Sequence, residues 1–181
     1  CEPVPLPEAQ LQRLDSHLAL VYTGKTRLAK NLLQTVLRQW YARAPALVGT
    51  LRDLVGNARA AAEAVRAGDL AGLGACLSRY WAHKQVMARG AEPPHVARLV
   101  QALRPLMLGH SLCGAGGGGF LVLLTREAGA GKPGGSVEQV LRECAAQDPS
   151  LADARVFEVQ IAREGLSVSV GSPPTAAMEL V

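Results

Sequence analysis

The sequence predicts an α+β domain of two layers, in which a four-stranded, mainly antiparallel sheet packs on about five helices. Some segments place apolar residues at helical spacing, and shorter ones are continuously apolar or alternate with polar residues. The strands do not alternate regularly with the helices along the chain, which favours α+β over α/β. The chain has 181 residues, of which 49% are hydrophobic and 19% charged. This composition can fill a core and excludes a disordered chain.

The first predicted strand follows a proline-rich start, which we expect to be extended. Residues 17–22 are almost continuously apolar, as is typical of a short buried strand. After a polar turn at residues 23–27, apolar side chains recur at every fourth position over residues 28–40. This spacing predicts a helix with one buried face.

Three more helices are predicted before the chain changes character. Pro45 suits the first turn of one helix, and Gly68 suits its C-terminal end. Asp69 fits the N-cap of the next helix, which ends near Gly90. A further helix ends or kinks at Pro105. Three aromatic residues fall on these helical stripes beside leucines and are expected in the core: Trp40, Tyr80 and Trp81.

The last third of the chain is predicted to hold three strands and one helix. Residues 120–124 are too apolar to face water on either side. Ser136 and Gln139 have the spacing of a capping box at the start of a helix. Apolar and polar residues then alternate over 157–161 and again over 166–170, which predicts a β-hairpin.

We expect residues 1–172 to form one domain and residues 173–181 to be a disordered tail. The chain begins at Cys1 with no segment resembling a signal peptide, so we expect a piece of a longer protein. The four cysteines share no CxxC spacing and are expected to be reduced thiols in a cytoplasmic protein.

The composition also indicates which classes of binding partner to expect. Aromatic residues make up only 4% of the chain, which argues against a stacking platform for single-stranded nucleic acid. The net charge of +4 permits an anionic ligand without requiring a nucleic acid. No apolar run approaches the roughly 20 residues that a membrane-spanning helix needs. We therefore expect neither a nucleic-acid partner nor a membrane span.

The strongest functional signal is a glycine-rich run that leads directly into an apolar strand. It consists of Gly114, Ala115, Gly116, Gly117, Gly118 and Gly119. Each glycine costs about 0.5–1 kcal/mol relative to alanine in regular structure. Such a run permits turns with positive φ and the close approach of main-chain N–H groups to an anion or another backbone. It follows a helix and opens a strand, which excludes a Rossmann fingerprint. We expect an ordered bend that forms part of a site.

A second candidate is the turn of Thr23, Gly24, Lys25, Thr26 and Arg27 before a predicted helix. A helix N-terminus already favours anions, and cations placed there oppose the helix dipole. Their presence indicates capture of a phosphate or carboxylate. Simple solvation of Lys25 and Arg27 is the equally supported alternative.

Metal and nucleophile chemistry find no support in the sequence. The four histidines lack HExxH-like spacing, and no cysteine lies in a nucleophile elbow. Cys113, just before the glycine run, is expected to be a small buried packing residue.

Together the two motifs resemble the C-terminal half of a GHMP small-molecule kinase. The glycine run resembles the third motif of that superfamily. Residues 22–34, 40–43 and 111–124 are similar to the L-fucose kinases within it. The resemblance extends from about Cys1 to the final predicted hairpin.

This resemblance implies an ATP-dependent sugar kinase that makes β-L-fucose 1-phosphate, the first step in the salvage of fucose toward GDP-fucose. It implies an active site between an N-terminal domain and this α+β domain. By the same resemblance, Gly114 to Gly119 shape the nucleotide and sugar cleft together with Thr23, Gly24, Lys25 and Arg27. ATP and Mg²⁺ would be bound mostly by the N-terminal domain.

Two departures from the family pattern bear on activity. Many relatives have lysine three residues before the first motif glycine, where this chain has Ser111. The family's ATP loop, Pro-x-x-x-Gly-Leu-Gly-Ser-Ser, does not occur in these 181 residues. We therefore expect no kinase activity from this chain alone. The alternatives are another GHMP sugar kinase, such as one acting on a heptose phosphate, or a non-catalytic interaction domain with the same fold.

Overall fold

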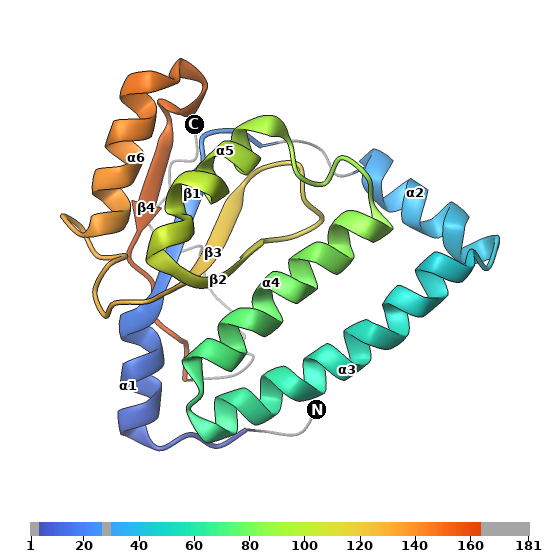
Figure 1. Cartoon of the computed structure of the whole chain (residues 1–181), viewed down its shortest axis with the longest axis horizontal. Helices are drawn as coiled ribbons and strands as arrows, with labels where there is room; N and C mark the ends of the chain where they lie inside the picture. The colour runs from blue at the N-terminus through green and yellow to red at the C-terminus, as the bar shows by residue number, and fades with distance from the viewer. Residues whose placement is uncertain (1–3, 27–29, 164–181) are drawn as a thin grey trace, which may run out of the picture.

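The computed structural model describes residues 4–26 and 30–163, and these form a sheet with helices packed against it (Figure 1). The helices are α1 (Glu8–His17), α2 (Lys30–Tyr41), α3 (Pro45–Ala67), α4 (Leu70–Met87), α5 (Pro94–Leu103) and α6 (Ser136–Gln147). The strands are β1 (Leu18–Thr23), β2 (Met107–Leu112), β3 (Phe120–Thr125) and β4 (Ala154–Phe157). Two 3₁₀ turns, Arg104–Leu106 and Pro149–Leu151, connect neighbouring elements.

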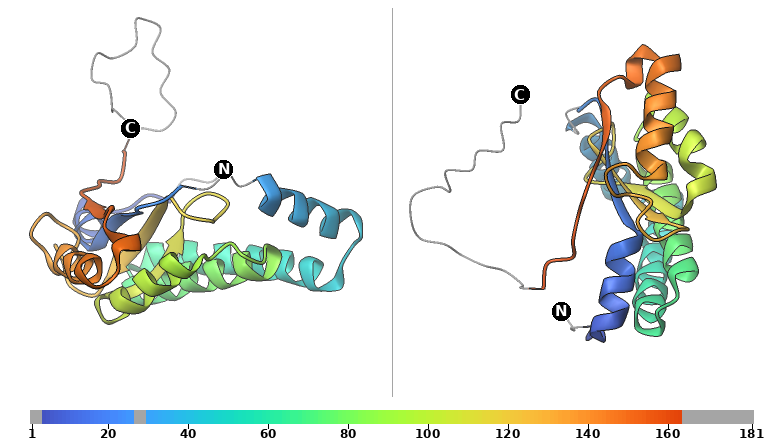
Figure 2. Two further views of the ribbon diagram at one scale, coloured as in Figure 1. Left: turned by 90° about the horizontal axis from the view of Figure 1, so that it is seen from above. Right: turned by 90° about the vertical axis from the view of Figure 1, so that its left-hand side faces the viewer.

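The four strands form a single antiparallel sheet in the order β2-β3-β1-β4. Helices α4, α5 and α6 lie against one face of this sheet, and α3 packs alongside α4 (Figure 2). The structure therefore confirms the predicted α+β class, the two layers and the antiparallel sheet.

The core lies between the sheet and these helices because alternate strand residues point toward them. Ala19 and Val21 of β1 are fully buried and lie opposite Leu123 and Leu121 of β3. The inner side chains of α5, including Leu99, belong to the same cluster. Full burial of one such leucine contributes roughly 1.5–3 kcal/mol.

The opposite face of the sheet is aromatic and partly exposed. The rings of Tyr22 and Phe120 are 5.5 Å apart, and those of Phe120 and Phe157 are 5.7 Å apart. Phe157 is 38% exposed. On this face Phe120 and Val122 are half-buried and Leu124 is buried, so the expectation that residues 120–124 are shielded from water on both sides is wrong for Phe120 and Val122.

Several predicted helix ends are confirmed. Gly68 follows α3 with a left-handed φ of 66°, and the side chain of Asp69 accepts a hydrogen bond from the Gly72 amide at the start of α4. The predicted capping box of α6 is wrong. Gly135 occupies the N-cap position, and the Glu138 carboxylate instead accepts from the Gly134 amide at 2.6 Å.

Two elements were not predicted from the sequence. Helix α1 begins directly after Pro7, whose φ of −57° and ψ of 144° are extended. Strand β2 contains Gly109 and His110, which hide its apolar pattern. It is a strand because it pairs with β3 along its length.

The predicted strand at residues 157–161 is also wrong. Strand β1 pairs with residues 154–157 instead, with Leu20 opposite Phe157. The chain then leaves the sheet, and the Ile161 amide donates to the Asp15 carboxylate at 2.7 Å. The second predicted hairpin strand, 166–170, and the predicted tail, 173–181, lie outside the described residues.

Of the three aromatic residues expected in the core, only Trp81 is buried. Trp40 is 53% exposed and Tyr80 is 40% exposed. Leu32 and Val36 of α2 pack against the core cluster, but Trp40 at the far end of this helix does not belong to it. Helix α2 extends beyond the sheet (Figure 2).

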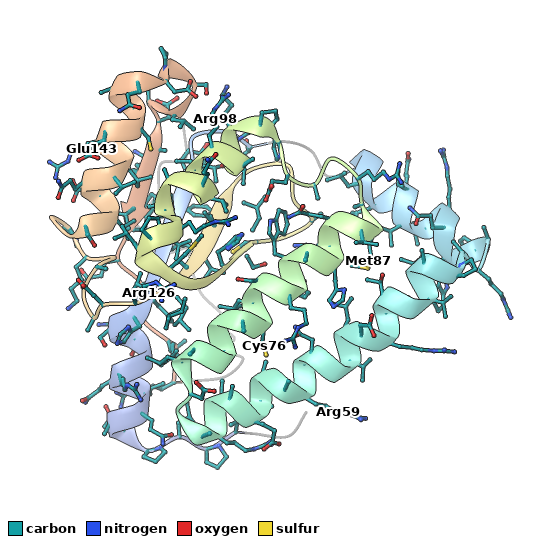
Figure 3. All side chains as sticks on the ribbon, in the orientation of Figure 1. Arg59, Cys76, Met87, Arg98, Arg126 and Glu143 are labelled. Atoms are coloured by element: carbon teal, nitrogen blue, oxygen red, sulfur yellow. The ribbon has the colours of Figure 1, made fainter. Side chains whose placement is uncertain are left out.

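The pair of helices α3 and α4 has a buried side and an exposed side. Cys76 lies between the two helices, whereas Arg59 of α3 points away from α4 (Figure 3).

Helix α4 crosses β2 so closely that two glycines make backbone contact. A Cβ atom added at Gly109 would overlap the carbonyl group of Gly74, and one added at Gly74 would lie 2.7 Å from the Leu108 carbonyl carbon. Both glycines are buried. The height of α4 above the sheet is therefore set by main-chain contact.

Gly109→Ala is expected to destabilise the chain by about 3 kcal/mol or more, because neither backbone can yield without moving α4. Gly56→Ala in α3 is the matched control, since its added methyl meets nothing within 4 Å. That change should stabilise the helix by about 0.5–1 kcal/mol. Denaturant unfolding measures both, and equal effects would contradict the proposed close crossing.

Candidate functional site

The glycine run and the turn after β1 are far apart in sequence but hydrogen-bonded in the structure. The Gly119 amide donates to the Lys25 carbonyl at 2.7 Å, and the Thr23 amide donates to the Gly119 carbonyl at 2.8 Å. A Cβ at Gly118 would overlap the Lys25 carbonyl oxygen. The two candidate motifs therefore form one structural unit.

The run is an ordered bend whose conformation requires glycine. All five of its glycines have φ between 64° and 136°, a region that L side chains rarely adopt. At Gly116, an added Cβ would also lie 2.9 Å from the Ala91 carbonyl oxygen. We refer to residues 114–119 as the glycine bend.

The middle of the glycine bend is fixed to the connection between α4 and α5. The Gly117 amide donates to the Ala91 carbonyl at 2.7 Å. The neighbouring Glu92 carboxylate accepts from the Trp81 indole at 2.6 Å and from the Gln85 amide at 3.2 Å. Both donors belong to α4, so this helix positions the connection that holds the bend.

Not all amides of the glycine bend are used within the protein. Within residues 4–26 and 30–163, those of Gly114, Ala115, Gly116 and Gly118 have no hydrogen-bond acceptor. Successive free main-chain N–H groups can form a concave site for an anion.

The turn residues have different environments. Thr23 is fully buried, and its hydroxyl donates to the Lys25 carbonyl at 3.2 Å, so its side chain shapes the turn. Gly24 has a φ of 81°. The Lys25 side chain is exposed. Arg27 lies outside the described residues.

The start of α5 places further charges near Lys25. Burial lowers the pKa of His95, and the positive charges of Lys25 and Arg98 lower it further, while Asp148 opposes them. Arg98 projects from α5 (Figure 3) and forms an ion pair with Asp148 at 2.8 Å. His95 therefore favours the neutral imidazole, and Lys25 is an exposed cation beside the glycine bend.

A cavity of about 450 Å³ opens beside Gly24. Its lining is Tyr22, Gly24, Ala152, Asp153, Ala154 and Arg155. The Arg155 guanidinium stacks on the rings of Tyr22 and Phe157, at 5.8 and 5.5 Å from their centroids. The sequence did not indicate Arg155, because its strand was predicted three residues too late.

Lys84 of α4 is a second residue that the sequence did not indicate, since a lysine on a helix is normally solvated. Lys84 is only 8% exposed, and its ammonium group contacts the start of the glycine bend. A buried lysine cannot be recognised from sequence without its tertiary neighbours.

The remaining candidate residues have clear positions. Cys113 is exposed, so its predicted burial is wrong, and with Cys76 and Cys144 it is a free thiol. Ser111 is buried in β2. In the described part of the chain, no group of three or more His, Cys, Asp or Glu side chains is arranged to hold a metal ion. None of its helices is both long and apolar enough to cross a membrane.

Residues 61–149 match the family described as "GHMP kinases C terminal". This segment begins within α3 and includes α4, β2, the glycine bend and β3. Residues 61–149 are thus similar to the C-terminal domain of GHMP kinases. This match includes the glycine run and agrees with the resemblance that the run carries.

Two curated relatives are bifunctional enzymes. The chain is 27% identical over 155 residues to the L-fucokinase/L-fucose-1-P guanylyltransferase of Bacteroides fragilis, covering 86% of this chain and 16% of that protein. It is 29% identical over 118 residues to the bifunctional fucokinase/GDP-fucose pyrophosphorylase of Arabidopsis thaliana, covering 65% and 11%. The chain thus spans less than one fifth of either relative.

Solved structures with the same fold include two mevalonate kinases. The enzyme from L. major in complex with R-mevalonate superimposes with a TM-score of 0.60 at 22% identity, covering 79% of this chain and 42% of that one. A second mevalonate kinase gives a TM-score of 0.51 at 16% identity, covering 84% and 42%. At these identities, the likeness extends to the fold.

Gly118→Ala is expected to break the Gly119–Lys25 hydrogen bond, because the new methyl would overlap the Lys25 carbonyl oxygen. We expect a loss of about 2–3 kcal/mol and faster hydrogen exchange at the Gly119 amide. Gly114→Ala is the control, since its added methyl meets nothing within 4 Å. This change should cost only about 1 kcal/mol of stability, which is the penalty for alanine at a left-handed φ of 64°. Unchanged exchange at Gly119 in Gly118→Ala would refute the close approach.

Proposed function

We propose that this chain is the C-terminal part of an ATP-dependent sugar kinase that converts L-fucose to β-L-fucose 1-phosphate. The observation that carries the proposal is the glycine bend, which is fixed to the turn after β1 and keeps four amides free within the described residues. The GHMP kinase domain and the similarity to two fucokinases support it. The product would enter salvage toward GDP-fucose.

In this proposal, the glycine bend forms one wall of the nucleotide and sugar cleft. The free amides of Gly114, Ala115, Gly116 and Gly118 suit a phosphate, because hydrogen bonds to a charged acceptor are stronger than those to a neutral one. Lys25 adds an exposed positive charge at the same place. Gly24 allows the turn to approach the bend, and Arg27 belongs to the same proposed site.

ATP and Mg²⁺ complete the proposed chemistry. Mg²⁺ bridges the phosphates and neutralises the charge that develops during phosphoryl transfer. We assign no described residue of this chain to the metal, and propose that an N-terminal domain of the longer protein holds Mg²⁺ and most of ATP. That domain is the proposed partner of residues 1–172, and the 181-residue chain alone would be inactive.

The free thiols Cys76, Cys113 and Cys144 support a cytoplasmic location.

The longer protein is expected to phosphorylate L-fucose with ATP and Mg²⁺, while the 181-residue chain shows no turnover. The measurement is ADP release over a panel of free and phosphorylated sugars, with product identity checked by NMR. Turnover of a heptose phosphate but not of L-fucose would replace the proposed substrate. No turnover of any sugar would favour a non-catalytic interaction domain.

Gly117→Val in the longer protein is expected to lower turnover by at least about 100-fold while the helices remain folded. A branched side chain at a φ of 89° is strained and would obstruct the main chain of the bend. Steady-state kinetics and far-UV circular dichroism measure the two effects. Gly134→Val, at a left-handed glycine with open space around it before α6, is the matched control. Wild-type rates in Gly117→Val would contradict the proposed site.

A further inference from the structure

We infer that Lys84 is a positioning residue of the proposed active site, whose ammonium group holds the start of the glycine bend against α4. This inference rests on the proposed function. The Lys84 Nζ atom donates to the Leu112 carbonyl at 3.0 Å and also to the Gly114 carbonyl. These two carbonyls flank Cys113, where the chain leaves β2 and enters the bend.

The surroundings of Lys84 satisfy its charge without a carboxylate. Nζ lies 5.3 Å from the centroid of the Tyr80 ring and 5.4 Å from that of the Trp81 ring. None of the ion pairs found in residues 4–26 and 30–163 includes Lys84. Its position in the last turn of α4 is favourable for a cation, because the helix dipole places partial negative charge there.

Burial of the Lys84 ammonium group costs free energy, because a charged group loses its hydration. Burial lowers the pKa of Lys84, and the electrostatic interaction with Cys113 opposes this shift. An apolar side chain of similar length could fill the same space without that cost. What an apolar side chain cannot do is donate hydrogen bonds to two carbonyls of the bend.

Lys84 acts beside a second attachment from the same helix. Trp81, one turn earlier on α4, donates to Glu92 in the connection whose Ala91 carbonyl accepts from Gly117. Lys84 thus holds the start of the bend, and Ala91 holds its middle. Loss of the ammonium group should release the start first, because the second attachment does not depend on it.

Hydrogen exchange on the 181-residue chain tests this attachment without any enzymatic assay. In Lys84→Met, the Cys113 amide, which donates to the Phe120 carbonyl at 2.7 Å, should exchange at least about 10-fold faster. The amides of α3 should keep their protection. Lys84→Arg, which retains the charge and the donors, should preserve protection at Cys113. Unchanged exchange at Cys113 in Lys84→Met would overturn the inference.

Two further variants keep this test decisive. Lys132→Met is the matched control, because Lys132 is exposed and its ammonium group lies 4.0 Å from the Glu158 carboxylate, away from the bend. It should leave exchange at Cys113 unchanged. If Lys84→Met does not fold, Lys84→Gln retains one donor group and should give an intermediate rate. A Lys84→Gln variant with wild-type exchange would count against the inference.

Kinetics of the longer protein test the link to catalysis, with ATP, Mg²⁺ and L-fucose as substrates. Lys84→Met should lower kcat at saturating substrate by about 100-fold, and Lys84→Arg should recover at least about 10-fold of that loss. Wild-type kcat in Lys84→Met would reject the positioning role. If the wild-type enzyme does not turn over L-fucose, the proposed function fails, while the exchange result still decides whether Lys84 holds the bend.

Discussion

A loop without side chains can be held in place only through its own peptide groups, and this constraint organises the structure around the glycine bend. Each attachment of the bend uses main-chain atoms: Gly117 bonds to Ala91, and Gly119 bonds to Lys25. The absence of Cβ atoms is what lets the backbones approach so closely. The same property leaves amides of the bend available to a ligand, so the features that fix the bend also suit it to a phosphate.

Helix α4 is the platform for this arrangement. Its N-terminal half crosses β2 by backbone contact between Gly74 and Gly109. Its C-terminal half carries Trp81 and Lys84, which fix the α4–α5 connection and the start of the bend. Helix α4 therefore has two roles: its backbone contact with β2 fixes its own distance from the sheet, and its side chains fix the shape of the glycine bend. Sites supported by rigid elements hold their geometry better than sites formed by loops alone.

The overall fold of this chain is shared with kinases that act on a different substrate, so the fold alone does not determine the substrate. Mevalonate kinases share the architecture at 22% identity or less, although the sugar of a fucokinase and mevalonate are chemically different. A common fold with different substrates is expected when specificity lies in a few side chains and loops. The proposed kinase function therefore depends on the glycine bend and its neighbours, and on the domain that would complete the cleft.

The sequence by itself determined those features whose physical cause is local. Helical periodicity predicted α2 to α5, the left-handed preference of glycine predicted the end of α3 at Gly68, and the unusual glycine run predicted an ordered bend before β3. These inferences succeeded because backbone propensity and side-chain spacing act within a few residues. The same run also resembles a GHMP kinase motif, and residues 61–149 match the C-terminal domain of GHMP kinases.

Only the tertiary structure decided the features that depend on distant partners. Strand β2 exists because β3 pairs with it, and β4 pairs at 154–157 because the register of β1 places Phe157 opposite Leu20. The burial of Lys84 and the exposure of Trp40 follow from where their helices lie relative to the sheet. Such contacts join residues far apart in the chain, so no local pattern encodes them.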